Sequence, residues 1–445
     1  MASTRFHLQH EETVNLKNIN QKRLKVGNLL IFSCFMTYML SMAVKGVFAA
    51  EVSYIKNLWN LTNVQIQFGN TAYFVLYGLV QILLFIFIKK VDLRIYLAIT
   101  VPISAVFAIL MGTCTGIVQM WAYFGLTGLF QAGIYSGCNA ILIKALPTCQ
   151  LSKANVIMNL GYACGTVISY GISGLCVSYD MWQIPYYILG GLFLLNSIAF
   201  IFISKYALRF CHINEIFNRK DITQPTTDSS NKQDNKKPSF ITLDTKKKTA
   251  WFYVIVLLLA FIITALYYCI MSNVTLFLTD VHGLPENIGI YVSIIAPITI
   301  AIGPVMTISA CEKHENFISE AIKFMAVLIV ATILLVLFYK VNMIFSLLLI
   351  IIYIVIAQGV KSIALSVITY NMRDQLNSGA YCAISNAVAS VAAGVMPTIL
   401  GMVLDNFGWT MSFVFTLALA VVFTLTLIII NVVITNSNKK LKNQN

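Results

Sequence analysis

Residues 228–237 read Asp-Ser-Ser-Asn-Lys-Gln-Asp-Asn-Lys-Lys, and they lie in a long polar segment that runs from Tyr206 to Lys248. This segment carries few large apolar residues, so it is predicted to be a linker without a packed core of its own. Apolar stretches of about 20 residues, the length that crosses a bilayer as a helix, lie on both sides of it. Six precede the segment and six follow it, so the chain is predicted to fold as two halves.

The composition excludes a soluble protein. Apolar residues make up 58% of the 445 residues and charged residues 11%, and the mean hydropathy is +0.80, which leaves too little polar surface for a water-soluble domain. Long unbroken apolar runs indicate helices rather than the alternating strands of a membrane barrel. The predicted spans are centred near residues 38, 79, 103, 131, 166, 195, 265, 298, 330, 357, 391 and 422. No cleavable signal peptide is expected, because the first 25 residues are polar.

Basic residues crowd into alternate loops, which predicts the orientation of the spans. One side has Lys22 and Arg23 near the N-terminus, the polar segment and Lys440 near the C-terminus, whereas the opposite loops offer only Lys56 and Lys340. The positive-inside rule then places both termini in the cytoplasm, and we expect a multi-pass protein of the plasma (inner) membrane. The net charge of +13 reflects this arrangement, so nucleic-acid binding is not expected.

The predicted fold class is therefore an all-α polytopic membrane protein with twelve transmembrane helices in two six-helix bundles. Two such bundles joined by a long cytoplasmic loop are the organisation of the major facilitator superfamily fold, whose parallel halves rock about a substrate site near the middle of the bilayer. The expected segments are a cytoplasmic N-terminal tail at 1–25, a first bundle at 26–205, a cytoplasmic linker at 206–249, a second bundle at 250–435 and a cytoplasmic tail at 436–445.

Two lysines interrupt predicted spans. Lys45 lies in the apolar run Val26–Ala50, and Lys361 lies in the run Met343–Tyr370. An ionisable side chain inside a span is costly, faces the protein interior or a water-filled cavity, and marks a functional site. No Asp or Glu falls in the hydrophobic body of a span in this assignment, with Glu51 taken as a residue of an outward loop. The two cations are therefore predicted to hold an anion, although Lys45 is also placed to reach the outer headgroups and Lys361 the cytoplasmic interface.

Polar side chains follow the same helical faces as the lysines. Residues at i, i+3, i+4 and i+7 share a face of a helix, and spans 1, 4, 7 and 10, which line the central cavity of the superfamily fold, all carry such polar stripes. Span 5 carries one as well. The candidate substrate-binding residues are Lys45, Tyr38, Gln131, Tyr135, Asn139, Asn159, Tyr162, Tyr267, Tyr268 and Lys361. Any single Ser, Thr or Asn in these stripes has the alternative of a hydrogen bond between helices.

The sequence offers no evident proton relay, metal site or catalytic group. All five histidines fall in predicted tails or loops, and proton-coupled transport usually relies on an acid or a histidine inside a span. Exchange of one anion for another needs no separate coupling ion. No His-based metal set, nucleophile–base pair or buried acid is recognised, so neither a cofactor nor an enzyme activity is expected. The ten cysteines form no CxxC pair and are expected to be packing residues.

Several short patches resemble the organophosphate:phosphate antiporters, the glycerol-3-phosphate and hexose-phosphate exchangers of the major facilitator superfamily. They are Tyr38–Ala49 in span 1, Tyr77-Gly78 in span 2, Gly128-Leu129-Phe130-Gln131 with Cys138 in span 4, Asn159 in span 5 and Asp405-Asn406-Phe407-Gly408-Trp409 before span 12. The resemblance implies exchange of a phosphate ester for inorganic phosphate. It also places Lys45 and Tyr267 where the family has two phosphate-binding arginines, Gln81 where it has a lysine and Tyr162 where it has a histidine.

The leading functional prediction is a secondary transporter that moves a small organic anion, a phosphate ester or a carboxylate, by alternating access, with anion exchange as one mode. One alternative is a permease of the same fold for an amino acid or another small nutrient, in which Lys45 meets only a carboxylate. The other is a transporter-like sensor that binds its ligand without moving it. The expected partners are the small-molecule anion and the lipid bilayer, and the protein is expected to be a monomer.

Overall fold

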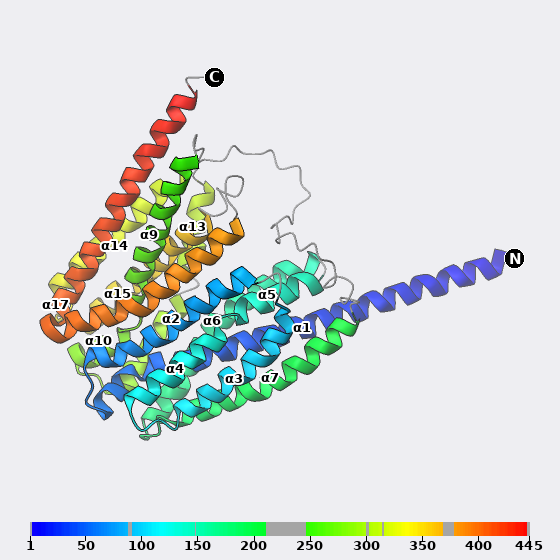
Figure 1. The fold of residues 1–445 in the computed structure, drawn as a ribbon, viewed down its shortest axis with the longest axis horizontal. Helices are drawn as coiled ribbons and strands as arrows, with labels where there is room; N and C mark the ends of the chain where they lie inside the picture. The colour runs from blue at the N-terminus through cyan, green and yellow to red at the C-terminus, as the bar shows by residue number, and fades with distance from the viewer. Residues whose placement is uncertain are drawn as a thin grey trace.

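The structure is a computed structural model, and it describes residues 2–87, 91–146, 148–210, 246–299, 302–313, 316–367 and 378–442. Helices make up nearly all of these residues, and no strand occurs among them (Figure 1). The polar segment 228–237, which divides the spans in the sequence, lies outside the described residues, as do His212 and His314. The helices before and after this segment form two groups.

The first group covers the chain before the polar segment. Its members are α1 (Ala2–Leu58), α2 (Asn63–Phe87), α3 (Leu93–Met111), α4 (Ile117–Gln131), α5 (Ile134–Ala145), α6 (Thr148–Val177) and α7 (Ile184–Phe210). α4 and α5 meet at Ala132 and Gly133 and together form one apolar segment long enough to cross a membrane. The group therefore contains six spans, as the sequence predicts.

The second group contains the other six spans. Its members are α9 (Lys246–Met271), α10 (Val274–His282), α11 (Glu286–Ser293), α12 (Ile295–Thr299), α13 (Ile302–Lys313), α14 (Phe317–Phe338), α15 (Met343–Ser362), the π-helical turn η1 (Ile363–Val367) and α17 (Ser378–Lys442). Among the described residues, 11 apolar segments are long enough to span a membrane. The longest, Ile384–Val432, holds two spans, because Gly408 breaks the helix with φ 74° and ψ −172°. A positive φ of this size suits glycine, which has no Cβ. With this segment divided in two, the twelve predicted spans are confirmed.

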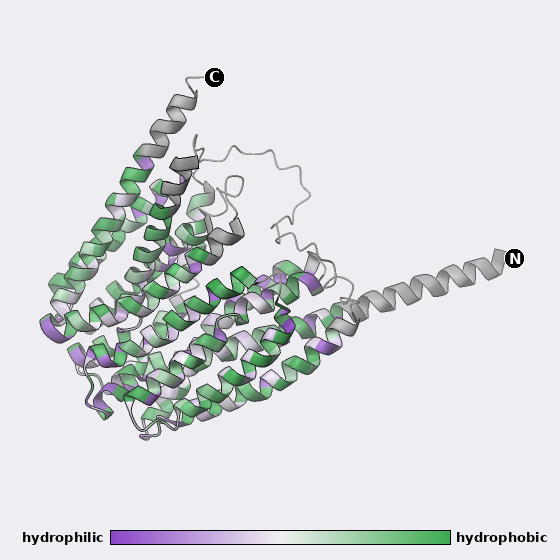
Figure 2. Ribbon diagram, in the orientation of Figure 1, coloured by the Kyte–Doolittle hydropathy of each residue, from purple (hydrophilic) through white to green (hydrophobic). Residues whose placement is uncertain are grey.

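Apolar side chains face outward along most of the helices. Leu195, Phe202 and Val305 are 66%, 68% and 66% exposed. Figure 2 shows hydrophobic residues along the helices and many of the hydrophilic residues at their ends. An apolar surface of this extent needs lipid rather than water around it, so the chain is a multi-pass integral membrane protein.

Each group of helices has a hydrophobic core of its own. The first core is built almost entirely from α1–α7 and includes Phe48, Phe124 and Phe193. The second is built from the helices between α9 and α17 and includes Phe277 and Phe413. A core in each group is what two packed helical bundles require.

Hydrogen bonds join the two bundles on one side of the molecule, where α1 ends and α2 begins. Asn63 of α2 donates its backbone and side-chain N–H groups to the Asp405 carboxylate of α17 at 2.9 and 2.7 Å, and Val64 donates to it at 3.0 Å. Further pairs that join the bundles here include Ser53 with Thr279 at 2.6 Å, Lys56 with Asp280 at 3.2 Å and Asn57 with Glu286 at 2.9 Å. In Figure 1 the bundles diverge toward the opposite side, where α1 and α9 begin and α7 and α17 end. The joined side is called the closed side below.

Candidate functional site

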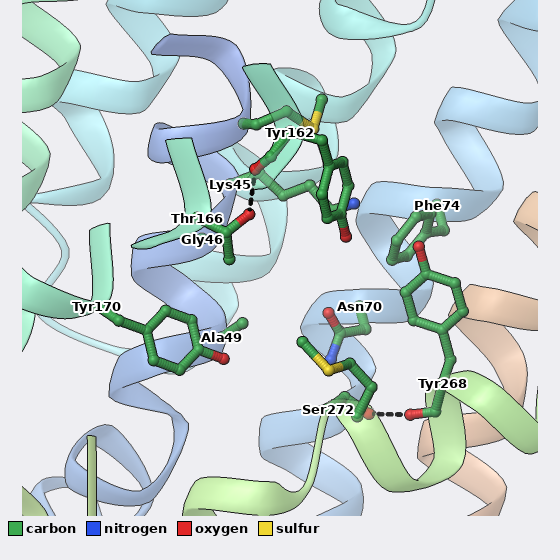
Figure 3. A pocket seen from close by; sticks show the side chains of 12 residues that line it. Lys45, Gly46, Ala49, Asn70, Phe74, Tyr162, Thr166, Tyr170, Tyr268 and Ser272 are labelled. Atoms are coloured by element: carbon green, nitrogen blue, oxygen red, sulfur yellow. Dashed lines mark hydrogen bonds between the residues drawn. The ribbon is translucent and has the colours of Figure 1, made fainter. Parts of the chain in front are cut away.

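A cavity of about 260 Å³ lies between the two bundles. It is lined by α1, α2 and α6 from the first bundle and by α9, α15 and α17 from the second. Its polar and aromatic lining residues are Tyr38, Lys45, Tyr73, Phe74, Tyr77, Gln81, Tyr162, Thr264, Tyr268, Lys361, Asn386 and Ser390. A smaller cavity of about 50 Å³ adjoins it (Figure 3) and shares Met42, Lys45, Phe74, Tyr162 and Tyr268 with it.

Lys45 projects from α1 into both cavities. Its Nζ lies 4.4 Å from the centre of the Phe74 ring, 5.5 Å from that of Tyr73 and 5.7 Å from that of Tyr162. Ring faces attract a cation but do not neutralise it. No described residue gives this ammonium group a hydrogen bond or a carboxylate within ion-pair distance. Lys45 therefore faces the cavity (Figure 3) and not the outer headgroups.

Lys361 enters the larger cavity from the second bundle, near the end of α15. Its Nζ lies 5.0 and 5.2 Å from the centres of the Tyr267 and Tyr268 rings, which meet edge to face at 4.9 Å. The Tyr268 ring centre is also 6.0 Å from Lys45 Nζ, so both ammonium groups border one ring. No Asp or Glu is among the described residues that line the two cavities. The described lining thus holds two lysine side chains and no acid.

The remaining candidate residues lie at different distances from the cavity. Tyr38, Tyr162 and Tyr268 line it. Tyr267 is 1% exposed and lies beside it. Asn139 lines neither of the two cavities.

A second layer of candidate residues supports the lining tyrosines. Gln131 of α4 accepts a hydrogen bond from the hydroxyl of Tyr73 at 2.6 Å. Tyr135 of α5 packs against Tyr38 with ring centres 4.9 Å apart, and its hydroxyl donates to Asn159 at 3.1 Å. Span 4 therefore contacts the lining tyrosines and contributes no residue to the lining of the two cavities. The sequence-based expectation places span 4 in the lining.

α2 and α17 contribute lining residues that the sequence reasoning missed. These are Tyr73, Phe74, Tyr77, Asn386 and Ser390. Tyr73, Tyr77 and Gln81 follow each other at intervals of four residues, which is the same helical-face pattern that marks the other polar stripes. Phe74 gives no such signal, because an aromatic residue does not stand out in an apolar helix.

Comparison with known proteins identifies the family. Residues 31–378 match the profile of the Major Facilitator Superfamily. The chain belongs to this superfamily. Because its members with this fold are transporters, the protein is a membrane transporter and not an enzyme.

Solved structures of transporters share the fold of this superfamily member. A bacterial homologue of the human lysosomal transporter Spinster, in an inward-facing and occupied conformation, has a TM-score of 0.65 and 14% identity over 90% of this chain and 96% of that one. The nucleoside transporter NupG has a TM-score of 0.64 and 14% identity over 90% of this chain and 98% of that one. Identities this low show the fold alone. The comparison with curated proteins gives no match.

Glu51 contradicts the expectation that no span of this superfamily transporter contains an acid. The sequence reasoning places Glu51 in an outward loop, but α1 continues to Leu58 and buries Glu51 completely, with 0% of its surface exposed. Neither carboxylate oxygen has a hydrogen-bond partner among the described residues. The expectation is wrong. The absence of an acid inside the spans can therefore no longer be used to exclude a proton-carrying group there.

Proposed function

We propose that this superfamily transporter moves a small organic anion, a phosphate ester or a carboxylate, across the membrane by alternating access. Lys45 is the primary contact of the anion, and Lys361 is the second cation. The observation that carries the proposal is the pair of ammonium groups that border the Tyr268 ring in a cavity with no described carboxylate in its lining.

The charge balance of the cavity supports an anionic ligand. Taking a cation out of bulk water costs several kcal/mol when no counter-charge replaces its hydration. Lys45 and Lys361 have no such counter-charge among the described residues, and like charges repel each other. A ligand with one or two negative charges removes both costs, since each ammonium group can donate three hydrogen bonds to carboxylate or phosphate oxygens.

Tyrosines around the lysines would orient the rest of the ligand. Tyr38, Tyr162 and Tyr268 line the cavity, so their hydroxyls offer hydrogen bonds and their rings offer apolar contact. Gln131 and Tyr135 act indirectly, because they hold lining tyrosines in place.

The chemistry of lysine does not favour phosphate over carboxylate. The resemblance to organophosphate:phosphate antiporters suggests a phosphate ester, yet Lys45 presents a point charge where that family has an arginine. A lysine lacks the planar fork of a guanidinium group and cannot bind phosphate through two parallel N–H donors. Both classes of anion therefore belong to the proposal.

The arrangement of the bundles supports movement of the ligand and not binding alone. The cavity lies between two bundles that are joined on the closed side and diverge on the other (Figure 1). Rocking of the bundles would break the closed-side hydrogen bonds and open the cavity there. We assign the diverging side, which has both chain ends, to the cytoplasm of a cell whose plasma (inner) membrane holds the protein. One chain builds the whole cavity, which fits a monomer.

Thermal unfolding of the purified protein tests the anion site. A ligand that binds the native state raises the apparent Tm by mass action, so the ligands to compare are inorganic phosphate, glycerol 3-phosphate, succinate and leucine. We expect a phosphate compound or succinate to stabilise the wild type and Lys340→Ala, whose lysine is exposed just after α14. The same anion should not stabilise Lys45→Ala. Stabilisation by leucine alone, or equal stabilisation of Lys45→Ala, would refute the anion site.

A further inference from the structure

Glu51 is buried among three helices, and no cation pairs with its carboxyl group among the described residues. Its side chain is 0% exposed, and both carboxyl oxygens lack hydrogen bonds among the described residues. Ser173 of α6 and Tyr186 of α7 lie against the carboxyl, and their hydroxyl oxygens are also buried without hydrogen bonds. Unsatisfied oxygens from α1, α6 and α7 therefore meet at one point inside the first bundle.

The titratable groups around Glu51 bring no positive charge. They are Tyr54 on α1, Cys176 on α6 and Tyr186 on α7, and the Tyr54 hydroxyl in turn donates to Asp180 at 3.1 Å. No described Lys, Arg or His forms an ion pair with Glu51. An ionised carboxylate here would lose its hydration without compensation, which costs far more than burying the neutral acid.

Glu320 shows how the same chain pairs a buried glutamate with a cation. Glu320 is 7% exposed, and it forms an ion pair with Lys323 at 2.7 Å. Glu51 and Glu320 are the buried acids among the described residues. Because Glu51 alone of the two has no cation, a bound proton is the positive charge that this site can take.

Glu51 stands between the cavity and the closed side on a single helix. Lys45, six residues earlier, points into the cavity, and a rise of 1.5 Å per residue puts about 9 Å between the two positions along α1. Shortly after Glu51, Ser53 and Lys56 make closed-side contacts with the second bundle. A movement of α1 that opens the closed side therefore changes the surroundings of Glu51 as well.

An aromatic cluster covers Glu51 toward the closed side. The Trp59 and Trp182 rings meet at 5.5 Å, and the Trp182 and Tyr186 rings meet at 6.2 Å. Trp182 is 4% exposed, and Tyr186 lies against Glu51. Displacement of these rings is the change that would give the carboxyl access to water.

We propose that Glu51 binds a proton that moves together with the anion, so that transport is proton-coupled symport. On this proposal the buried carboxyl is the neutral acid in the closed conformation, and small rotations would make Ser173 and Tyr186 its hydrogen-bonding neighbours. Opening of the closed side hydrates the group, and it exchanges its proton there; only the O–H bond forms and breaks. This inference rests on the proposed anion transport, because it names the ion that is coupled to it.

Infrared difference spectroscopy of the purified full chain tests whether Glu51 holds a proton. At neutral pH we expect the wild type to show the carbonyl stretch of a protonated carboxylic acid, and we expect this component to vanish in Glu51→Gln and to remain in Glu320→Gln. Glutamine has the shape of the neutral acid, so Glu51→Gln should fold, and Glu51→Asp should keep a shifted band. If the spectrum of Glu51→Gln keeps the same carbonyl component as the wild type, or the wild type shows none, the proposal is overturned.

Proteoliposomes that enclose a pH-sensitive dye test the coupling. Inward gradients of glycerol 3-phosphate and of succinate are the probes, and liposomes without protein give the background. A transported probe should acidify the lumen with wild type and Glu320→Gln, but not with Glu51→Gln, while it still raises the Tm of all three. If the wild type moves neither probe, the proposal that it transports an organic anion fails. If a probe enters without protons, or a Na⁺ gradient drives it instead, anion transport stands and proton coupling is overturned.

Discussion

Lys45 has no counter-charge among the described residues of this membrane protein, and this predicts an unusual mutant. Lys45→Met keeps the length of the side chain and removes the cost of an uncompensated cation. We expect the Tm of the ligand-free protein to rise by a few degrees, since roughly 1 kcal/mol shifts the Tm of a large domain by about 2 °C. Stabilisation by anions should disappear at the same time.

Lys340→Met is the matched control for this substitution, because Lys340 is exposed just after α14 and lies outside the cavity lining. Its Tm should stay close to that of the wild type, as is usual for surface substitutions, and anions should still raise it. A fall in the Tm of Lys45→Met would mean that the ammonium group of Lys45 stabilises the fold, and the cavity would then need no anion.

The sequence predicts cavity residues only where they contrast with their surroundings. Lys45 and Lys361 are charges in apolar runs, and the structure places both at the cavity. Phe74 lies 4.4 Å from the Lys45 ammonium group, but it is one apolar residue among many in its helix. Glu51 follows the last apolar residue of its run, so the sequence places it in a loop, and only the continuation of α1 to Leu58 shows that it is buried.

At the scale of helices, two glycines of α6 differ in their surroundings: Gly165 packs closely against α1, and Gly171 faces open space. A Cβ at Gly165 would clash with the carbonyl oxygen of Met39 and lie 2.9 Å from the Ala43 nitrogen, whereas Gly171 has nothing within 4 Å of such an atom. Gly165→Ala should force α1 and α6 apart and cost about 1–3 kcal/mol. Gly171→Ala should be neutral or stabilise by up to about 1 kcal/mol, because alanine favours a helix. Thermal unfolding compares the two, and equal changes in Tm would contradict this packing.

Asp405 caps the first turn of α2 from the other bundle. It accepts hydrogen bonds from Asn63 and Val64, and a carboxylate at a helix N-terminus satisfies N–H groups that are otherwise without partners. Asp405→Ala should therefore weaken the closed side and shift the protein toward conformations that are open there. Asn406→Ala is the matched control, because the Asn406 side chain donates to Met402 within its own helix at 2.8 Å.

Spin labels at Val118 and Val341 measure this shift. The two side chains are 69% and 74% exposed, just inside α4 and just after α14, at the ends of the two bundles that reach the closed side. The fraction of long distances should grow in Asp405→Ala and stay at the wild-type value in Asn406→Ala. An unchanged distribution in Asp405→Ala would show that the cap does not hold the bundles together.

The helices were predictable from hydropathy, whereas their breaks and contacts were not. A bilayer demands apolar stretches of a fixed length, so twelve spans follow from composition. Composition does not indicate where a backbone bends, and the division at Ala132 and Gly133 was missed. The hydrogen bond between Asn63 and Asp405 joins positions 342 residues apart, which no local pattern can reveal.

At the scale of the whole molecule, the division into two bundles was predictable and the closed side was not. The polar segment of the sequence separates six spans from six, and the structure has a separate core on each side of it. The conformation depends instead on pairs such as Ser53 with Thr279 and Asn57 with Glu286. These contacts depend on how the bundles dock, so they follow from the three-dimensional arrangement alone.

Uptake into proteoliposomes measures most directly whether the whole molecule moves an anion by way of Lys45. Labelled inorganic phosphate, glycerol 3-phosphate, succinate and leucine are offered to vesicles that contain the wild type, Lys45→Ala or Lys340→Ala. The wild type and Lys340→Ala are predicted to take up at least one of the anions and no leucine, with uptake lost in Lys45→Ala. Anion uptake by Lys45→Ala at the wild-type rate, or uptake of leucine alone by the wild type, would contradict the account.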